Sequence, residues 1–274
     1  MQRADLHIHT RASDGELSPV ELVRAAVAGR LDVIAVTDHD TIAGLPDALA
    51  AAAETPLRVV PGIEVSSLHE GREVHVLGYG VDPEVASLLA HQDEAVNRRE
   101  ARAREMVRLL QGLGMRVEWE DVLRAAGADA RAIGRPHLAR ALLANGQVRS
   151  FGEAFDRDLG DQGPAFVRSA LPAVRDAIAT IRAAGGIAVW AHPDRDVLEP
   201  FAPAFAEWGL GGIECFRPST GPEDGRRLLS TARQLRLVPT GGSDWHGPHR
   251  SALGDFFVPA DQVRELLDAV LPPA

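Results

Sequence analysis

The sequence predicts an α/β protein in which βαβ units surround a parallel or mixed sheet, with a helical segment inserted in the middle. Short β-type runs alternate with helix-type runs over about the first 80 residues, and this alternation resumes after about residue 165. Between them, residues 84–165 are rich in arginine and alanine and contain no convincing β run. We therefore expect one barrel-like domain from residues 1–83 and 166–274, interrupted by a helical insertion domain at 84–165.

The first expected strand presents two imidazoles on one face. Polar and apolar residues alternate in residues 5–9. The two-residue strand period therefore places His7 and His9 together, opposite Leu6 and Ile8. Next, Ser18-Pro19-Val20-Glu21 supplies an N-cap, a proline at the first helical position and a glutamate at the third, which predicts a helix over 19–28.

Three further strands are expected before the insertion. An apolar run at 31–36 leads into Thr37-Asp38-His39-Asp40, and an alanine-rich helix follows. The next strand, at 57–60, leads into Pro61-Gly62-Ile63-Glu64, and the last covers 74–77. Each of these runs carries a histidine or a glutamate within it or directly after it.

The remaining elements follow from the same signals. In the insertion we expect helices at 94–113 and 136–143, the second opened by a proline and closed near Asn145-Gly146. After it we expect the elements in this order: a helix at 173–184, strands at 186–191 and 212–216, a helix at 222–235, and a short strand at 237–239 before Gly241-Gly242-Ser243-Asp244-Trp245-His246.

Composition restricts the class of protein. The chain has 274 residues, 29 basic and 39 acidic side chains, a net charge of −10, 45% hydrophobic residues and a single cysteine, as in soluble globular proteins. All 29 basic residues are arginine, so lysine Schiff-base and lysine general-base mechanisms are excluded. The acidic excess argues against binding of long duplex nucleic acid.

We expect no membrane span, no signal peptide and a cytoplasmic location. We expect the lone Cys215 to be a small core residue.

Histidines and carboxylates gather where the predicted strands end. In barrel-like α/β folds these ends meet on one face. Imidazoles with carboxylates suit Zn²⁺, Mn²⁺ or Fe²⁺, and the absence of thiolate ligands argues against a closed structural zinc site. His69, His91 and His249 lie outside this pattern, and Glu214 lies on the remaining strand. Asp5, Asp38 and Asp40 are expected either to orient ligands or to be simple turn residues. The residues that form the pattern are His7, His9, His39, Glu64, His75, His192, Asp244 and His246.

Five short motifs occur in an order that resembles a known family. They are His7-Ile8-His9 with Ser13-Asp14-Gly15, Thr37-Asp38-His39-Asp40, Gly62-Ile63-Glu64, Ala191-His192-Pro193 and Gly242-Ser243-Asp244-Trp245-His246-Gly247. Over nearly the whole chain this order resembles the polymerase and histidinol phosphatase (PHP) family. The resemblance implies a distorted (β/α)7 barrel. It is closest to the bacterial phosphoesterases with an inserted helical domain, which include 3′,5′-nucleoside bisphosphate phosphatases and 5′→3′ exonucleases that act on short 5′-phosphorylated RNA.

The resemblance also implies up to three divalent metal ions, Mn²⁺, Zn²⁺ or Fe²⁺. One ion would be held by His7, His9, Glu64 and Asp244, a second by Asp14, His39 and His246, and a third by Glu64, His75 and His192. Glu64 would bridge ions. Glu64, His192 and Asp244 are the expected catalytic residues, His192 and Asp244 foremost as metal ligands. No separate general acid is assigned.

Phosphate recognition is expected from arginine, whose planar guanidinium makes bidentate contacts. Arg135 in Gly134-Arg135-Pro136-His137 precedes a helix whose N-terminus favours an anion. The resemblance supports Arg135 and adds His137. Arg99 and Arg102 lie three residues apart on one helix and could add contacts or be merely solvated. Trp190 and Trp245 flank ligand motifs, and packing against the barrel is favoured over stacking on a base.

The expected activity is hydrolysis of the 3′-phosphate of nucleoside 3′,5′-bisphosphates, with short 5′-phosphorylated RNA as a further substrate. The expected nucleophile is a hydroxide that bridges two metal ions. Three alternatives stay open: a histidinol-phosphate-type phosphatase, an amidohydrolase-like C–N hydrolase and an idle metal-binding PHP module. The absence of a lysine to be carbamylated argues against the second, and the presence of all nine ligand positions argues against the third. Small phosphorylated nucleotides or short oligoribonucleotides are the expected partners, and the oligomeric state is open.

Overall fold

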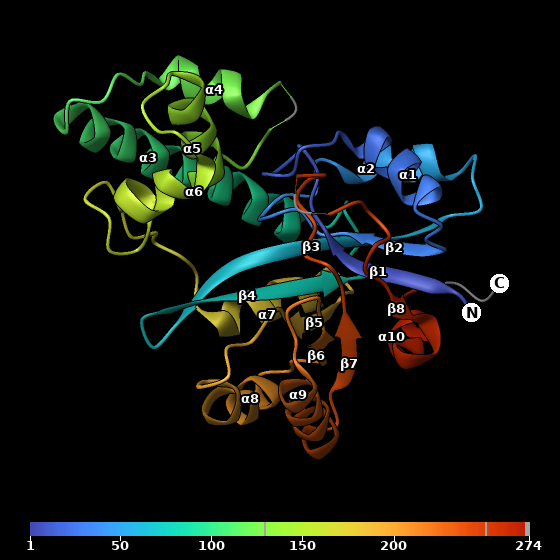
Figure 1. The fold of residues 1–274 in the computed structure, drawn as a ribbon. Coiled ribbons are helices and arrows are strands. Elements are labelled where there is room, and N and C mark those ends of the chain that lie inside the picture. Colours follow the sequence, from blue (N-terminus) through green and yellow to red (C-terminus); the bar gives the residue numbers. More distant parts are fainter. Residues whose placement is uncertain (129, 250, 272–274) are drawn as a thin grey trace.

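The computed structural model describes residues 1–128, 130–249 and 251–271 and has one eight-stranded sheet at its centre. The sheet curves into a nearly closed barrel (Figure 1). Its strand order is β7-β6-β5-β4-β3-β2-β1-β8. The strands are β1 (Arg3–Ile8), β2 (Val33–Val36), β3 (Arg58–His69), β4 (Arg72–Tyr79), β5 (Ile187–Trp190), β6 (Gly212–Phe216), β7 (Val238–Gly241) and β8 (Val258–Pro259).

The helices fall into two groups (Figure 1). Those that surround the barrel are α1 (Pro19–Ala28), α2 (Leu45–Ala52), α7 (Val174–Ala183), α8 (Leu198–Glu207), α9 (Pro222–Leu235) and α10 (Arg264–Val270), with a 3₁₀ turn, η2 (Ala260–Gln262). Those between β4 and α7 are α3 (Ala86–Gly112), α4 (Trp119–Ala126), α5 (Arg135–Ala144) and α6 (Phe151–Ala154), followed by a π-helical turn, η1 (Phe155–Leu159).

Strand pairing makes the sheet mixed. β1, β2 and β3 pair in parallel, as do β5, β6 and β7, whereas β4 is antiparallel to both β3 and β5. β8 is a two-residue antiparallel strand on the edge of β1 that the sequence analysis does not predict. The predicted α/β barrel with an inserted helical segment is confirmed.

The barrel closes where β1 meets the chain that follows β7. The N–H of His9 donates to the carbonyl of Trp245 at 2.9 Å, and the N–H of Ser243 donates to Asp5 Oδ1 at 2.8 Å. A Cβ at Gly242 would collide with the backbone of His7, so only glycine permits this approach. Closure therefore brings the first strand against the last ligand motif.

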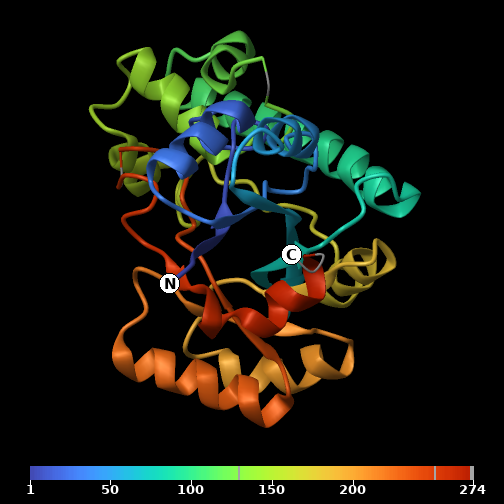
Figure 2. The same ribbon diagram turned by 90° about the vertical axis from the view of Figure 1, so that its right-hand side faces the viewer.

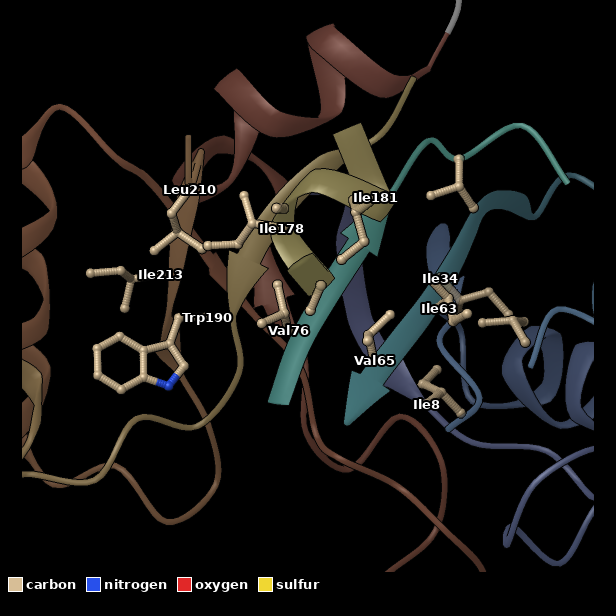
Figure 3. Packing of buried hydrophobic residues seen from close by; sticks show 14 of the residues in the cluster. Ile8, Ile34, Ile63, Val65, Val76, Ile178, Ile181, Trp190, Leu210 and Ile213 are labelled. Carbon is tan, nitrogen blue, oxygen red and sulfur yellow. The ribbon is translucent and has the colours of Figure 1, made fainter. Parts of the chain in front are cut away.

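Buried aliphatic side chains from the strands pack against the surrounding helices. Figure 3 shows Ile8, Ile34 and Ile63 on one side of the core and Trp190 and Ile213 on the other. A second buried cluster includes Leu6, Val60 and Tyr79. These two clusters hold the strand ends in fixed positions.

The helices between β4 and α7 build a hydrophobic cluster of their own. It includes Met106, Leu110, Leu138 and Leu142. In Figures 1 and 2 this group lies at the opposite end of the molecule from α8 and α9. The insertion boundaries at residues 84 and 165 stay a prediction. Within the described ranges, no helix combines the length and the apolar character needed to cross a bilayer.

Candidate metal centre

All nine residues that the sequence analysis predicts as metal ligands lie together at one end of the barrel. His7 lies in β1, Glu64 in β3 and His75 in β4. The other six lie in loops that follow strand ends, where parallel strands of a barrel bring distant parts of the chain together. These six are His9, Asp14, His39, His192, Asp244 and His246.

The side chains of the set predicted for the first ion lie close together. His7 Nε2 lies 3.4 Å from both Glu64 Oε2 and Asp244 Oδ1. His9 Nε2 lies 3.3 Å from the same two oxygens. Two imidazole nitrogens and two carboxylate oxygens therefore converge on one point.

The side chains of the other two predicted sets also lie near one another. Asp14 Oδ1 lies 3.4 Å from His246 Nε2, and Asp14 Oδ2 lies 3.9 Å from His39 Nε2. His75 Nδ1 and His192 Nε2 each lie 3.1 Å from Glu64 Oε1 and 3.2 Å from each other.

Glu64 joins these sets through its two carboxylate oxygens. Oε1 faces His75 and His192, whereas Oε2 faces His7, His9 and His39, the last with its Nδ1 at 2.9 Å. The side chain is fully buried. This division of its oxygens is the arrangement that a carboxylate bridging two cations requires.

Buried polar atoms at this point fit divalent cations. Among the described residues, His7 Nε2 and His9 Nε2 are buried and make no hydrogen bond, and His39 Nδ1 and Glu64 Oε2, although 2.9 Å apart, do not form one either. Unpaired polar atoms are costly in a protein interior, so such a group requires an explanation. Imidazole nitrogens and carboxylate oxygens are the ligands that first-row divalent metals prefer. The donor set therefore fits the expected cations.

The electrostatics of the cluster favour positive charge. Burial lowers the pKa of His75 and His246, but the carboxylates of Glu64 and Asp14 outweigh it and raise these values to about 10 and about 9. Burial and the neighbouring imidazoles of His246 and His39 instead lower the pKa of His9 to about 3. The carboxylates therefore attract protons or metal ions to this pocket.

Glu214 forms hydrogen bonds with two of the predicted ligands. This fully buried residue of β6 accepts a hydrogen bond from His7 Nδ1 on Oε1 at 2.9 Å and one from the backbone N–H of His192 on Oε2 at 2.8 Å. The first bond places the imidazole proton on Nδ1 and leaves Nε2 free to face the cluster. The sequence analysis missed this role, although a glutamate inside an apolar strand was a signal that could have found it.

The three aspartates whose roles were left open hold loop backbones. Asp38 accepts hydrogen bonds from the backbone of Thr10 and from the hydroxyls of Thr10 and Ser13, so it fixes the loop that carries Asp14. Asp5 binds the backbone of Ser243. None of these bonds reaches a ligand imidazole.

Asp40 pairs with an arginine of the long helix α3. Arg99 Nε donates to Asp40 Oδ2 at 2.7 Å, and Arg99 Nη2 donates to Ser66 Oγ at 2.8 Å. Burial would raise the pKa of Asp40, but Arg99 and His91 hold it below its usual range. This buried pair links α3 to the loop that carries His39.

Two of the predicted ligand residues have strained backbones. His192 and Asp244 have φ values of +31° and +52°, in the region that normally favours glycine. Such strain is typical of functional residues held by their surroundings. Glu214 helps to stabilise the strained backbone of His192, since it accepts a hydrogen bond from the backbone N–H of that residue.

Arg135 lines a cavity of about 240 Å³ together with His75 and His192. Its Nη1 lies 2.6 Å from Asp161 Oδ1. His137 is almost fully buried, and its Nδ1 accepts the N–H of Gly134 at 3.0 Å, so one ring nitrogen already caps α5. Substrate binding by Arg135 and His137 stays a prediction.

The remaining candidates have ordinary structural contacts. Arg102 Nε donates to the carbonyl of Val167 at 2.7 Å. Trp190 is buried against Phe205, and Trp245 is buried with its indole N–H bonded to Ser251, as the packing interpretation predicts. The three histidines outside the pattern contact other groups. His69 packs edge-on against Phe201, His91 lies 3.4 Å from Asp40, and His249 lies 2.7 Å from Glu16.

Comparison with known proteins gives several similar chains. The family model described as "PHP domain" matches residues 5–119. A 5′-3′ exoribonuclease from Haemophilus influenzae is 36% identical over 99% of this chain and 97% of its own length. A 3′,5′-nucleoside bisphosphate phosphatase from Chromobacterium violaceum is 34% identical over 90% of this chain and 88% of its own.

Two further similarities bear on fold and substrate. A crystal structure described as that of a metal-dependent phosphoesterase from Bifidobacterium adolescentis has a TM-score of 0.89 at 32% identity, over 99% of this chain and 97% of that one. A phosphoribosyl 1,2-cyclic phosphate 1,2-diphosphodiesterase from Eggerthella lenta is 34% identical over 89% of this chain and 94% of its own. The similar proteins thus differ in substrate.

Proposed function

The chain belongs to the PHP family of metal-dependent phosphoesterases, and we propose that it removes the 3′-phosphate of nucleoside 3′,5′-bisphosphates and also acts on short 5′-phosphorylated RNA. The observation that carries this proposal is the cavity in which Arg135 lies beside His75 and His192. A phosphate ester that enters there meets a guanidinium and the predicted ligands of one metal ion in the same space.

We infer that three divalent ions, Mn²⁺, Zn²⁺ or Fe²⁺, occupy the three ligand sets described above. When bound, such ions activate a water molecule and neutralise charge on the phosphoryl group. Glu64 would hold two of them through its separate oxygens. Glu214 would keep His7 in the tautomer that presents Nε2.

The exposure of the ligands indicates the side from which substrate approaches. The side chains of Asp244 and His192 are 37% and 30% exposed, whereas those of His7, His9 and Glu64 are fully buried. Asp244 and His192 therefore border the space open to substrate, which supports their proposed catalytic roles beside the bridging Glu64. Arg135 would orient the phosphate, with His137 behind it on the same helix.

The test is phosphate release from adenosine 3′,5′-bisphosphate, histidinol phosphate and a short 5′-phosphorylated RNA, each with Mn²⁺ and with a chelator. The proposal expects metal-dependent turnover of the bisphosphate and the RNA and little of histidinol phosphate. Preference for histidinol phosphate would instead favour that phosphatase activity. Hydrolysis of all three compounds at equal rates in chelator would contradict the metal role.

Arg135→Ala provides a second test of the same proposal. Because Arg135 would bind substrate and would not hold a metal ion, this variant is expected to raise KM more than it lowers kcat. An unchanged KM for the bisphosphate would contradict the proposed role of Arg135 in substrate binding.

A further inference from the structure

The cavity beside His75 and His192 contains a second arginine that the proposed function does not use. β4 pairs with β5 only from Val76 onward, so on that side the segment from Arg72 to Val74 has no strand partner in the described part of the chain. Arg72 lines the cavity from this open edge, whereas Arg135 lines it from the start of α5. Two guanidinium groups from different segments therefore border one cavity of about 240 Å³.

Each of these arginines is paired with an aspartate that stands mostly in solvent. Arg72 Nη2 lies 2.8 Å from Asp196 Oδ2, and Arg135 Nη1 lies 2.6 Å from Asp161 Oδ1. The side chains of Asp196 and Asp161 are 61% and 74% exposed. Neither aspartate belongs to a buried network, so each side chain can rotate toward solvent and leave its arginine available to another anion.

Ion pairs of this kind are easily exchanged. An exposed arginine–carboxylate pair contributes little to stability, because solvent screens it and two side chains lose freedom. A phosphate group offers more oxygens and more negative charge to the same guanidinium than a carboxylate does. A phosphate group is therefore expected to displace either aspartate from its arginine.

We propose that Arg72 binds the phosphate group that is not hydrolysed, so that the site selects substrates with two phosphate groups. The inference rests on the proposed function. One phosphate ester would lie at the metal cluster next to Arg135, and the other would displace Asp196 from Arg72. Substrate selection would then depend on a residue of the β3–β4 hairpin that contributes nothing to the metal centre.

The experiment compares two substrates that share the scissile group. Adenosine 3′,5′-bisphosphate and adenosine 3′-monophosphate both carry the 3′-phosphate, but only the first carries a second one. Arg72→Gln is expected to raise KM for the bisphosphate about tenfold or more and to change KM for the monophosphate by less than about twofold. Asp196→Asn is expected to lower KM for the bisphosphate, because it frees Arg72.

The two variants are expected to change KM for the bisphosphate in opposite directions, and this distinguishes substrate binding by Arg72 from a structural role of the ion pair. If the ion pair merely stabilised the hairpin, both variants would shift KM in the same direction, and the inference would be overturned. Equal effects of Arg72→Gln on the two substrates would overturn it as well. Arg168→Gln is a matched control, since Arg168 contacts the hairpin at the carbonyl of Gly71 but does not line the cavity. It is expected to leave both KM values unchanged.

Failure of the proposed function gives a different result. If the unmodified protein hydrolysed neither adenosine compound, the bisphosphate activity itself would be wrong, and this inference with it. If it hydrolysed both and only the Arg72→Gln comparison failed, the phosphatase activity would stand without the second phosphate site.

Discussion

Replacing Arg99 with alanine removes the arginine of a buried ion pair and leaves its carboxylate behind. Arg99 has a 13% exposed side chain, and Asp40 is fully buried. Breaking such a pair typically costs about 3–5 kcal/mol because one charge remains unpaired. Asp40 keeps its bond from the N–H of Ser66, at 2.8 Å, and its contact with His91, so we expect the lower end, about 3 kcal/mol.

The assay is thermal unfolding measured by calorimetry. For a chain of this size, about 3 kcal/mol corresponds to a fall in Tm of about 6–12 °C. The control is Arg108→Ala on the same helix, because Arg108 is 71% exposed and pairs only with Glu105 among the described residues. It is expected to cost less than about 1 kcal/mol. A Tm for Arg99→Ala equal to that of Arg108→Ala would refute the assignment of a stabilising buried pair.

The other predictions concern the metal centre and the cysteine. His39→Ala and Glu64→Gln are expected to abolish phosphate release while the protein stays folded; full activity of Glu64→Gln would exclude a bridging role. Glu214→Gln is expected to weaken metal binding by about 10–100-fold, measured by titration of the metal-free protein, since one of the two oxygens that accept from His7 and from the backbone of His192 becomes an NH2 group, which cannot accept a hydrogen bond. An unchanged affinity would show that Glu214 does not orient His7. Removal of metal by a chelator is expected to lower Tm, and Mn²⁺ at 100 times its Kd should restore about 2.7 kcal/mol; equal Tm values would argue against binding to this cluster. Cys215 is buried, and burial raises the pKa of its thiol to about 12, so thiol reagents should react only after unfolding; fast labelling of the native protein would contradict its burial.

Local sequence signals predicted the elements that depend on local chemistry. The Ser18-to-Glu21 pattern predicted the start of α1, and the structure shows both capping hydrogen bonds. The apolar run at 212–216 became β6. Strand-end placement also grouped eight of the nine candidate ligands: seven share one end of the barrel because their strands run in the same direction, whereas His75 reaches that end from the antiparallel β4.

The elements that the sequence analysis did not predict depend on tertiary contacts. β8 has two residues, one of them a proline, and exists because it pairs with β1. α8 contains Pro203, which normally argues against a helix interior, and packing of Phe201 and Phe205 in the core offsets this preference. Such elements have weak local signals, so only the assembled core identifies them.

The contacts that support the site were also not predictable from local sequence signals. Asp40 and Arg99 are 59 residues apart, and Glu214 and His7 are 207 residues apart. No periodicity connects positions so distant in the chain. His137 has a structural contact that the family motif did not indicate. The motif suggested a contact with substrate, whereas in the structure Nδ1 of His137 accepts the N–H of Gly134 at the start of α5.

The approach of Gly242 to His7 also has a consequence for biosynthesis. Residues 7–9 leave the ribosome early, whereas Asp244 and His246 emerge more than 230 residues later. A nascent chain that has released only its first 240 residues holds seven of the nine predicted donors and lacks Asp244 and His246, which complete the first two predicted ligand sets. Cation binding by the full predicted ligand set would thus be a late event of synthesis, because it waits for contacts such as that of Ser243 with Asp5, which are 238 residues apart in the chain.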